Sequence, residues 1–143
     1  MEKHVRLVYP GTVRKAKEAV KKANEILGNP EFYDQIRGYR TFDTTDLSPE
    51  VIAGMMEDGD HRITVDLSVL ILNTKAASSS PERITLSYWN FSTHLPSAVN
   101  TLIHETVNAM DRFRNQAKNK PLENRPQPTA PWVIGAIAEI MVK

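Results

Sequence analysis

The stretch His104-Glu105-Thr106-Val107-Asn108 lies in the middle of a segment that the sequence predicts to be one long helix, from Ser97 to about Ala117. Apolar residues recur there every three or four positions, the period of a helix with one buried side; they are Val99, Leu102, Ile103, Val107, Met110 and Phe113. Residues four apart project from the same helix face, and Glu105 lies about 100° round the axis from His104. The helix therefore presents an imidazole, a carboxylate and the Asn108 amide close together.

Two β-strands are predicted ahead of this helix. From Ile63 to Ile71 apolar and polar residues alternate with the two-residue period of a strand, and the alternation returns from Ile84 to Tyr88. The small residues of segment 76–81 predict a flexible loop between them. The two strands are therefore expected to pair antiparallel as a β-hairpin, with residues 84–91 at the edge of a twisted sheet.

Helices are predicted elsewhere in the chain, over residues 13–27, 48–56 and 132–142, from apolar stripes and from the Ser48-Pro49 start signal, with a short helical turn over residues 31–36. The segment from Pro121 to Pro131 holds four prolines and is expected to be neither helix nor central strand. The expected fold is α+β. It combines an antiparallel or mixed twisted sheet, an edge strand beside the long helix, and a C-terminal helix.

Composition narrows the possible functions. A chain of 143 residues is expected to form a single domain over residues 1–143. The formal charge of +1 gives no whole-molecule field that would indicate nucleic acid or a membrane as partner. The absence of cysteine excludes thiolate metal sites. With no export leader and no run of about 18 apolar residues, the default expectation is a cytoplasmic monomer, and a domain cut from a longer secreted protein would look the same.

The spacing within the long helix is typical of zinc chemistry. Two imidazoles four residues apart can bind one zinc ion, and a glutamate beside the first can deprotonate a zinc-bound water for attack on a peptide bond. A catalytic zinc takes three protein ligands, so a third must come from elsewhere. Glu139 is the candidate, because it is the one charged residue in an otherwise apolar segment 132–142. A solvated position for Glu139, or a pairing with Lys or Arg, is the alternative.

The segment from Ile63 to Val142 resembles the zincin metallopeptidases, and among them the gluzincins, in which a downstream helix donates a glutamate as third ligand. The resemblance implies a zinc cofactor held by His104, Asn108 and Glu139, with Glu105 as general base. It also implies that an edge strand binds the substrate in extended form, which assigns Ser87, Tyr88 and Trp89 to substrate binding. Asp111 matches a position where similar peptidases carry an acid, and it is expected either to orient the metal ligands through hydrogen bonds or to stabilise the helix.

Asn108 is the departure from the family pattern. An amide oxygen is a weak donor for zinc, so metal affinity should fall sharply. An engineered change, a natural pseudo-enzyme and a working site with replacement ligands remain open, and His94 is the candidate replacement. Two functions are therefore expected to compete: a zinc-dependent metallopeptidase that Asn108 can inactivate, and a non-catalytic peptide-binding or protein-binding module on the same scaffold.

Overall fold

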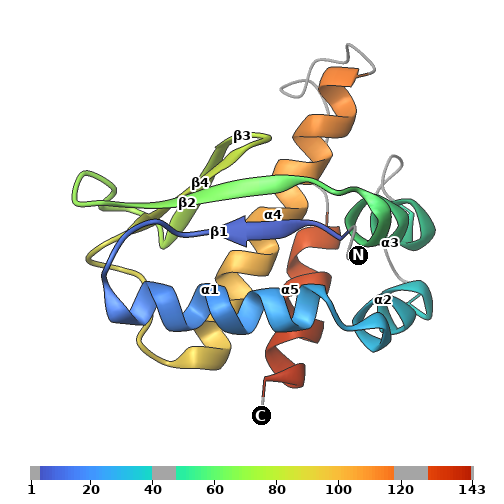
Figure 1. Ribbon diagram of the computed structural model, residues 1–143, viewed down its shortest axis with the longest axis horizontal. Coiled ribbons are helices and arrows are strands. Elements are labelled where there is room, and N and C mark those ends of the chain that lie inside the picture. Colours follow the sequence, from blue (N-terminus) through green and yellow to red (C-terminus); the bar gives the residue numbers. More distant parts are fainter. Residues whose placement is uncertain (1–3, 40–47, 118–128, 143) are drawn as a thin grey trace.

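Four short strands form one mixed sheet in the order β1-β2-β4-β3 (Figure 1). The computed structural model describes residues 4–39, 48–117 and 129–142. The strands are β1 (Arg6–Val8), β2 (Arg62–Ser68), β3 (Ala76–Ser80) and β4 (Arg83–Ser87). β1, β2 and β4 run parallel, and β3 is antiparallel to β4. The prediction of an α+β fold with a mixed sheet is confirmed.

The predicted pairing of the two strands is wrong. β2 and β4 are parallel neighbours, with Val65 opposite Ile84, and they do not form a hairpin. The reason is that segment 76–80, predicted to be a loop, forms β3 and reverses the chain once more before β4 begins. The edge strand on this side of the sheet is consequently β3, and β4 lies inside the sheet.

The predicted helices are present. They are α1 (Arg14–Leu27), α2 (Pro30–Arg37), α3 (Pro49–Asp58), α4 (Leu95–Ala117) and α5 (Ala130–Met141). α3 begins as its sequence predicts, with the Ser48 hydroxyl accepting a hydrogen bond from the Val51 N–H and Pro49 in the first turn. Most of the proline-containing segment lies outside the described residues, but Pro131 is in the first turn of α5, where a proline is tolerated.

The helices α1 and α4 pack against each other, and each also contacts the sheet, α1 through β1 and α4 through β3 and β4. Both helices therefore lie on the same side of the sheet, as predicted. The core between sheet and helices includes the fully buried side chains of Ile63, Ile84, Leu86, Leu102 and Ile103. Within the part of the chain that the structure describes, no helix is both long enough and apolar enough to cross a membrane.

α5 packs closely along α4, and Gly135 makes this possible. A Cβ atom at Gly135 would overlap the side-chain oxygen of Asn100 and lie 3.0 Å from the Asn100 backbone oxygen. The absence of a side chain at Gly135 thus allows α5 to approach the face of α4 that carries Asn100 and His104.

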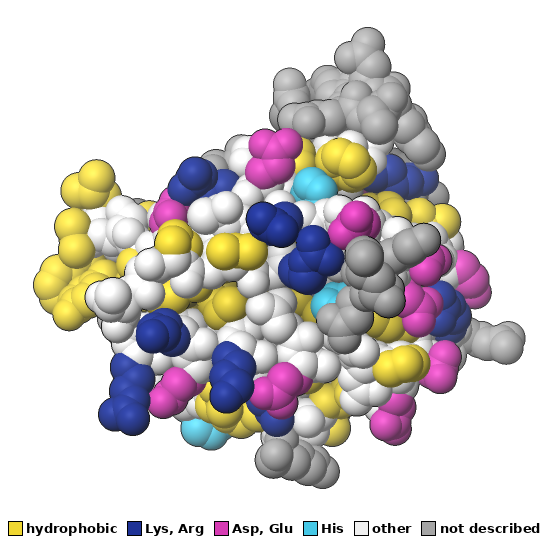
Figure 2. Space-filling view, in the orientation of Figure 1, with side chains coloured by type: hydrophobic (Ala, Val, Ile, Leu, Met, Phe, Trp, Pro, Cys, Tyr) yellow, Lys and Arg dark blue, Asp and Glu magenta, His cyan; other side chains and the backbone are white. Residues whose placement is uncertain are grey.

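Charged and apolar side chains are distributed unevenly over the surface. In Figure 2 apolar and basic side chains gather at the end where β2 leaves the sheet and α1 begins, whereas acidic side chains predominate at the opposite end, over α2 and α3. The near-zero formal charge of the whole chain is therefore the sum of a more basic end and a more acidic end.

Candidate functional site

A cavity of about 310 Å³ opens between α4, α5 and the β3 edge of the sheet. Its walls bring together three of the predicted site residues, His104, Glu105 and Glu139. The rest of the lining consists of Thr74, Lys75, Ala76, Ser97, Asn100, Thr101 and Trp132. Segments far apart in the sequence thus converge on the part of α4 that carries His104 and Glu105.

His104 is largely buried, and its ring packs edge to face against Trp132 of α5, with ring centroids 4.4 Å apart and an angle of 73° between the planes. Burial lowers the pKa of His104, because removal from water disfavours the charged imidazolium. The imidazole is therefore neutral at neutral pH and keeps a lone pair that can accept a proton or bind a metal.

Glu105 is a largely buried carboxyl group of the cavity. Burial raises its pKa, and three weaker effects oppose the rise: a hydrogen bond from the Asn108 side chain, one from the Ser78 backbone, and the charge of Arg112. The Asn108 amide lies 3.4 Å from Glu105 Oε1, and His104 Nε2 lies 4.0 Å from Oε2. A carboxylate held in this way between an imidazole and a strand edge is suited to proton transfer.

The hydrogen bonds between β3 and β4 show which backbone groups of β3 face away from β4. The Ser87 N–H donates to the Lys75 carbonyl over 2.8 Å, so these two residues form a hydrogen-bonded pair of the β3–β4 ladder. Such pairs alternate along an antiparallel ladder, so Ala76 and Ser78 turn their backbone groups away from β4. The bond from the Thr74 hydroxyl to the Ala76 carbonyl, 3.1 Å long, agrees with this phase. The outer edge of β3 therefore borders the cavity.

Glu139 is partly buried on α5 and accepts a hydrogen bond of 2.6 Å from the Asn100 side-chain amide. Asn100 is a site residue that sequence reasoning missed. Its signal is the spacing: Asn100 precedes His104 by four residues and so shares its helix face. Trp132 and Ser78 were also missed, since nothing in their local sequence indicates that they approach α4.

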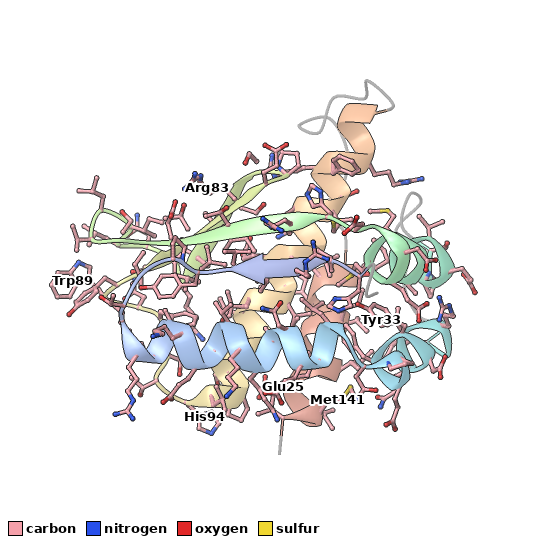
Figure 3. All side chains as sticks on the ribbon, viewed as in Figure 1. Glu25, Tyr33, Arg83, Trp89, His94 and Met141 are labelled. Carbon is pink, nitrogen blue, oxygen red and sulfur yellow. The ribbon has the colours of Figure 1, made fainter. Side chains whose placement is uncertain are left out.

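Other predicted residues lie outside the cavity lining. Asn108 is partly buried and turned toward Glu105, and Asp111 is buried farther along α4. Ser87 is buried, with its hydroxyl donating to the Ile71 carbonyl, while Tyr88 and Trp89 are exposed where the chain leaves β4. Figure 3 shows Trp89 projecting at one end of the molecule.

The assignment of residues 84–91 to the edge strand is therefore wrong, because β3 lies outside β4. The strand beside the cavity is Ala76–Ser80. His94 is exposed ahead of α4, with its Nδ1 3.2 Å from the Ser97 hydroxyl, and it too lies outside the cavity lining.

The donor set does not fit zinc. Over residues 4–39, 48–117 and 129–142 the structure contains no group of three or more His, Cys, Asp or Glu side chains placed to hold a metal ion. His104 and Glu139 line the cavity, but Glu139 is engaged by Asn100, and Asn108 supplies an amide that donates to Glu105. A zinc site with three protein ligands needs one more strong donor than these residues provide.

Comparisons with protein-family models, with curated proteins and with solved structures find no match to this chain. Similarity to known proteins therefore assigns neither a family nor an activity to this chain. The cavity and the strand edge that borders it are the features of the molecule that bear on its function.

Proposed function

We propose that the cavity is a peptide-binding cleft of the zincin metallopeptidase type, in which Asn108 stands in place of a second histidine. The observation that carries this proposal is the meeting of His104, Glu105 and Glu139 in one cavity beside the outward-facing edge of β3. With Asn108 present, the chain binds extended peptide segments and hydrolyses them slowly or not at all.

Peptide binding is supported by the orientation of the β3 backbone, which at Ala76 faces away from β4 and borders the cavity, although Ala76 itself is only 4 % exposed. Ala76 lines the cavity and directs its N–H and C=O away from β4, so that an extended segment can pair with it as an additional strand. The Ser78 N–H already donates a hydrogen bond to the Glu105 carboxylate, so the added strand would be short. Lys75 and the exposed Trp132 are available at the walls for the carboxylate and apolar groups of such a segment.

Hydrolysis by the chain as it stands is the second candidate, and the pKa of Glu105 favours it. A carboxyl group whose pKa is raised toward neutrality is better matched to general base catalysis than an ordinary glutamate. A cleft that only binds peptide has no need of a buried, perturbed carboxyl group beside a neutral imidazole.

The variant Asn108→His tests the metallopeptidase proposal, because it restores the pair of imidazoles four residues apart on one helix face. Native mass spectrometry with and without zinc is expected to find about one zinc per chain in Asn108→His and little in the parent. Asn108→Gln, which keeps an amide at this position, is the matched control. Failure of Asn108→His to take up zinc would refute the family assignment.

Activity is measured on an unfolded protein substrate. Asn108→His with zinc should cleave it, and the further change Glu105→Gln should abolish cleavage while zinc uptake persists. Cleavage by the parent chain at a rate comparable with Asn108→His would favour the second candidate.

Peptide binding is tested separately on the parent chain, with a pooled set of unstructured fluorescent peptides. Ala76→Pro removes an N–H that is not part of the β3–β4 ladder, and edge strands tolerate proline at such positions. This variant should keep its thermal stability within a few degrees and lose peptide binding. Undiminished binding would contradict strand addition at β3.

A further inference from the structure

A group of large apolar side chains is exposed at the end of the sheet where β2 and β4 stop. These two strands are parallel neighbours, so the segments that follow them lie side by side. The indole N–H of Trp89 donates to the Val69 carbonyl over 3.0 Å and joins them directly. We refer to residues 69–72 and 88–89 as the apolar tip; its exposed large side chains are Val69, Leu70, Leu72, Tyr88 and Trp89.

The apolar tip is a projection and not a groove. Figure 2 shows apolar side chains protruding at this end of the molecule, and Figure 3 shows Trp89 pointing outward there. Leu70 is 85 % exposed, and it is the contiguity of five exposed large apolar side chains, more than any one of them, that marks an interaction surface. Side chains arranged in this way can insert into an apolar medium or into a binding partner.

Four backbone groups of the apolar tip are hydrogen-bonded to the protein's own side chains. The carbonyls of Val69, Ile71 and Leu72 accept hydrogen bonds from the side chains of Trp89, Ser87 and Asn90. The Leu70 N–H donates to the Ser68 hydroxyl over 3.0 Å. In a loop surrounded by water these bonds are dispensable, but in an apolar medium each unsatisfied backbone group costs several kcal/mol.

Basic side chains flank the apolar tip. Lys15 of α1 donates to the Tyr88 carbonyl over 3.0 Å and lies 5.3 Å from the centre of the Tyr88 ring, which fixes the start of α1 beside the tip. Arg14 and Lys17 lie on the same turns of α1, Lys75 follows the tip in sequence, and Glu18 is the opposing carboxylate. Among these described residues there are four cations and one acid, and the acid, Glu18, pairs with Arg14 over 3.3 Å.

The opposite end of the molecule is acidic. The described parts of α2 and α3 carry five carboxylates and one arginine: Glu31, Asp34, Arg37, Glu50, Glu57 and Asp58. A negatively charged surface would therefore attract the end with the apolar tip and repel the other end, which orients the molecule with the tip toward that surface (Figure 2).

We propose that the apolar tip docks on an anionic lipid bilayer. Leu70, Leu72 and Trp89 enter the interfacial region, where aromatic and aliphatic side chains are favoured, and the basic residues of α1 contact phospholipid headgroups. The small total charge of the chain gives no indication of a membrane partner. A membrane partner is indicated instead by the separation of charge between the two ends and by the side-chain hydrogen bonds to four backbone groups of the tip.

Sedimentation with lipid vesicles tests this docking. The protein is expected to bind vesicles that contain phosphatidylserine, to bind phosphatidylcholine vesicles weakly, and to be released by salt. The double variant Leu70→Ser/Leu72→Ser should lose about tenfold or more in binding. Ile140→Ser is the matched control, because Ile140 on α5 and Leu72 are both 66 % exposed; it should bind as the parent does.

Fluorescence locates the contact. In the background Trp132→Phe the remaining tryptophan is Trp89, whose emission should shift to the blue on phosphatidylserine vesicles and be quenched by a lipid-borne quencher. Absence of vesicle binding, or equal binding by the leucine variant, would overturn the proposal. A concentration-dependent dimer that the leucine variant loses would also overturn it, by showing that the tip contacts a second copy of the chain. These results are independent of the peptide cleft.

Discussion

The close contact between α4 and α5 can be tested with a matched pair of glycine substitutions. A Cβ atom at Gly54 in α3 would have no neighbouring heavy atom within 4 Å, so Gly54→Ala meets open space. An alanine in a helix is favoured over glycine by roughly 0.5 to 1 kcal/mol, and Gly54→Ala should stabilise the fold by about that amount. Gly135→Ala gains the same helix preference but must displace Asn100, and overpacking costs about 1 to 3 kcal/mol.

The two variants should therefore differ by roughly 1 to 3 kcal/mol in the free energy of unfolding, with Gly54→Ala the more stable. For a domain of this size each kcal/mol shifts the melting temperature by roughly 3 °C, so calorimetry should separate the two variants by about 3 to 10 °C. Gly135→Ala should in addition loosen the bond between Asn100 and Glu139 and change the cavity. An equal gain in melting temperature for both alanines would refute the close approach of α5 to Asn100.

Three further predictions concern polar side chains: two concern hydrogen bonds, and one concerns the ionisation of a buried carboxyl group. Asn100→Ala should destabilise the fold by about 1 to 2 kcal/mol in urea titrations, because the partly buried Glu139 carboxylate loses a hydrogen bond of 2.6 Å; unchanged stability would show that water replaces it. Glu105→Gln should be more stable than the parent at neutral pH. Since burial raises the folded-state pKa of Glu105, its ionisation costs stability as pH rises above about 4.5, and the advantage of Gln should vanish at lower pH. Tyr33→Phe should lower stability by about 1 to 2 kcal/mol, as the buried Leu27 carbonyl loses a bond of 2.5 Å, and a neutral result would count against that bond.

The helices could be predicted from the sequence because their signals are local. The apolar stripe of α1 and the Ser48-Pro49 start of α3 each lie within the element that they predict. The alternation in β2 and β4 is equally local. β4 is found where it indicates, whereas β2 ends at Ser68, before the alternation ends at Ile71.

The sheet order could not be predicted, because it depends on β3. Alanine and serine have little preference for strands, and Ala76–Ser80 becomes a strand through backbone pairing with β4. Missing this one short strand changed the predicted relation of β2 to β4 from parallel to antiparallel. It also moved the predicted edge strand from β3 to the segment that contains Tyr88 and Trp89.

The parts of the candidate site that could be predicted are those that depend on the geometry of a single helix. The four-residue spacing indicates the face that carries His104, and Glu139 is conspicuous as the charge in an apolar helix. The partner of Glu139 could not be inferred, since Asn100 lies 39 residues away and reaches it only through the packing of α5 on α4. The Ser78 backbone bond to Glu105 depends in the same way on tertiary structure.

That bond also bears on how the β3 edge can pair with other strands. The open edge of a sheet is a template on which strands of other copies can add, and this leads to aggregation unless something obstructs it. β3 is short, its register shifts between Ser78 and Ser80, and the Glu105 carboxylate covers the Ser78 N–H. A full strand from another sheet would have to displace that carboxylate, whereas a peptide of a few residues at Ala76 would not. The Glu105 carboxylate is therefore expected to oppose strand addition at the β3 edge, whatever chemistry it performs in the cavity.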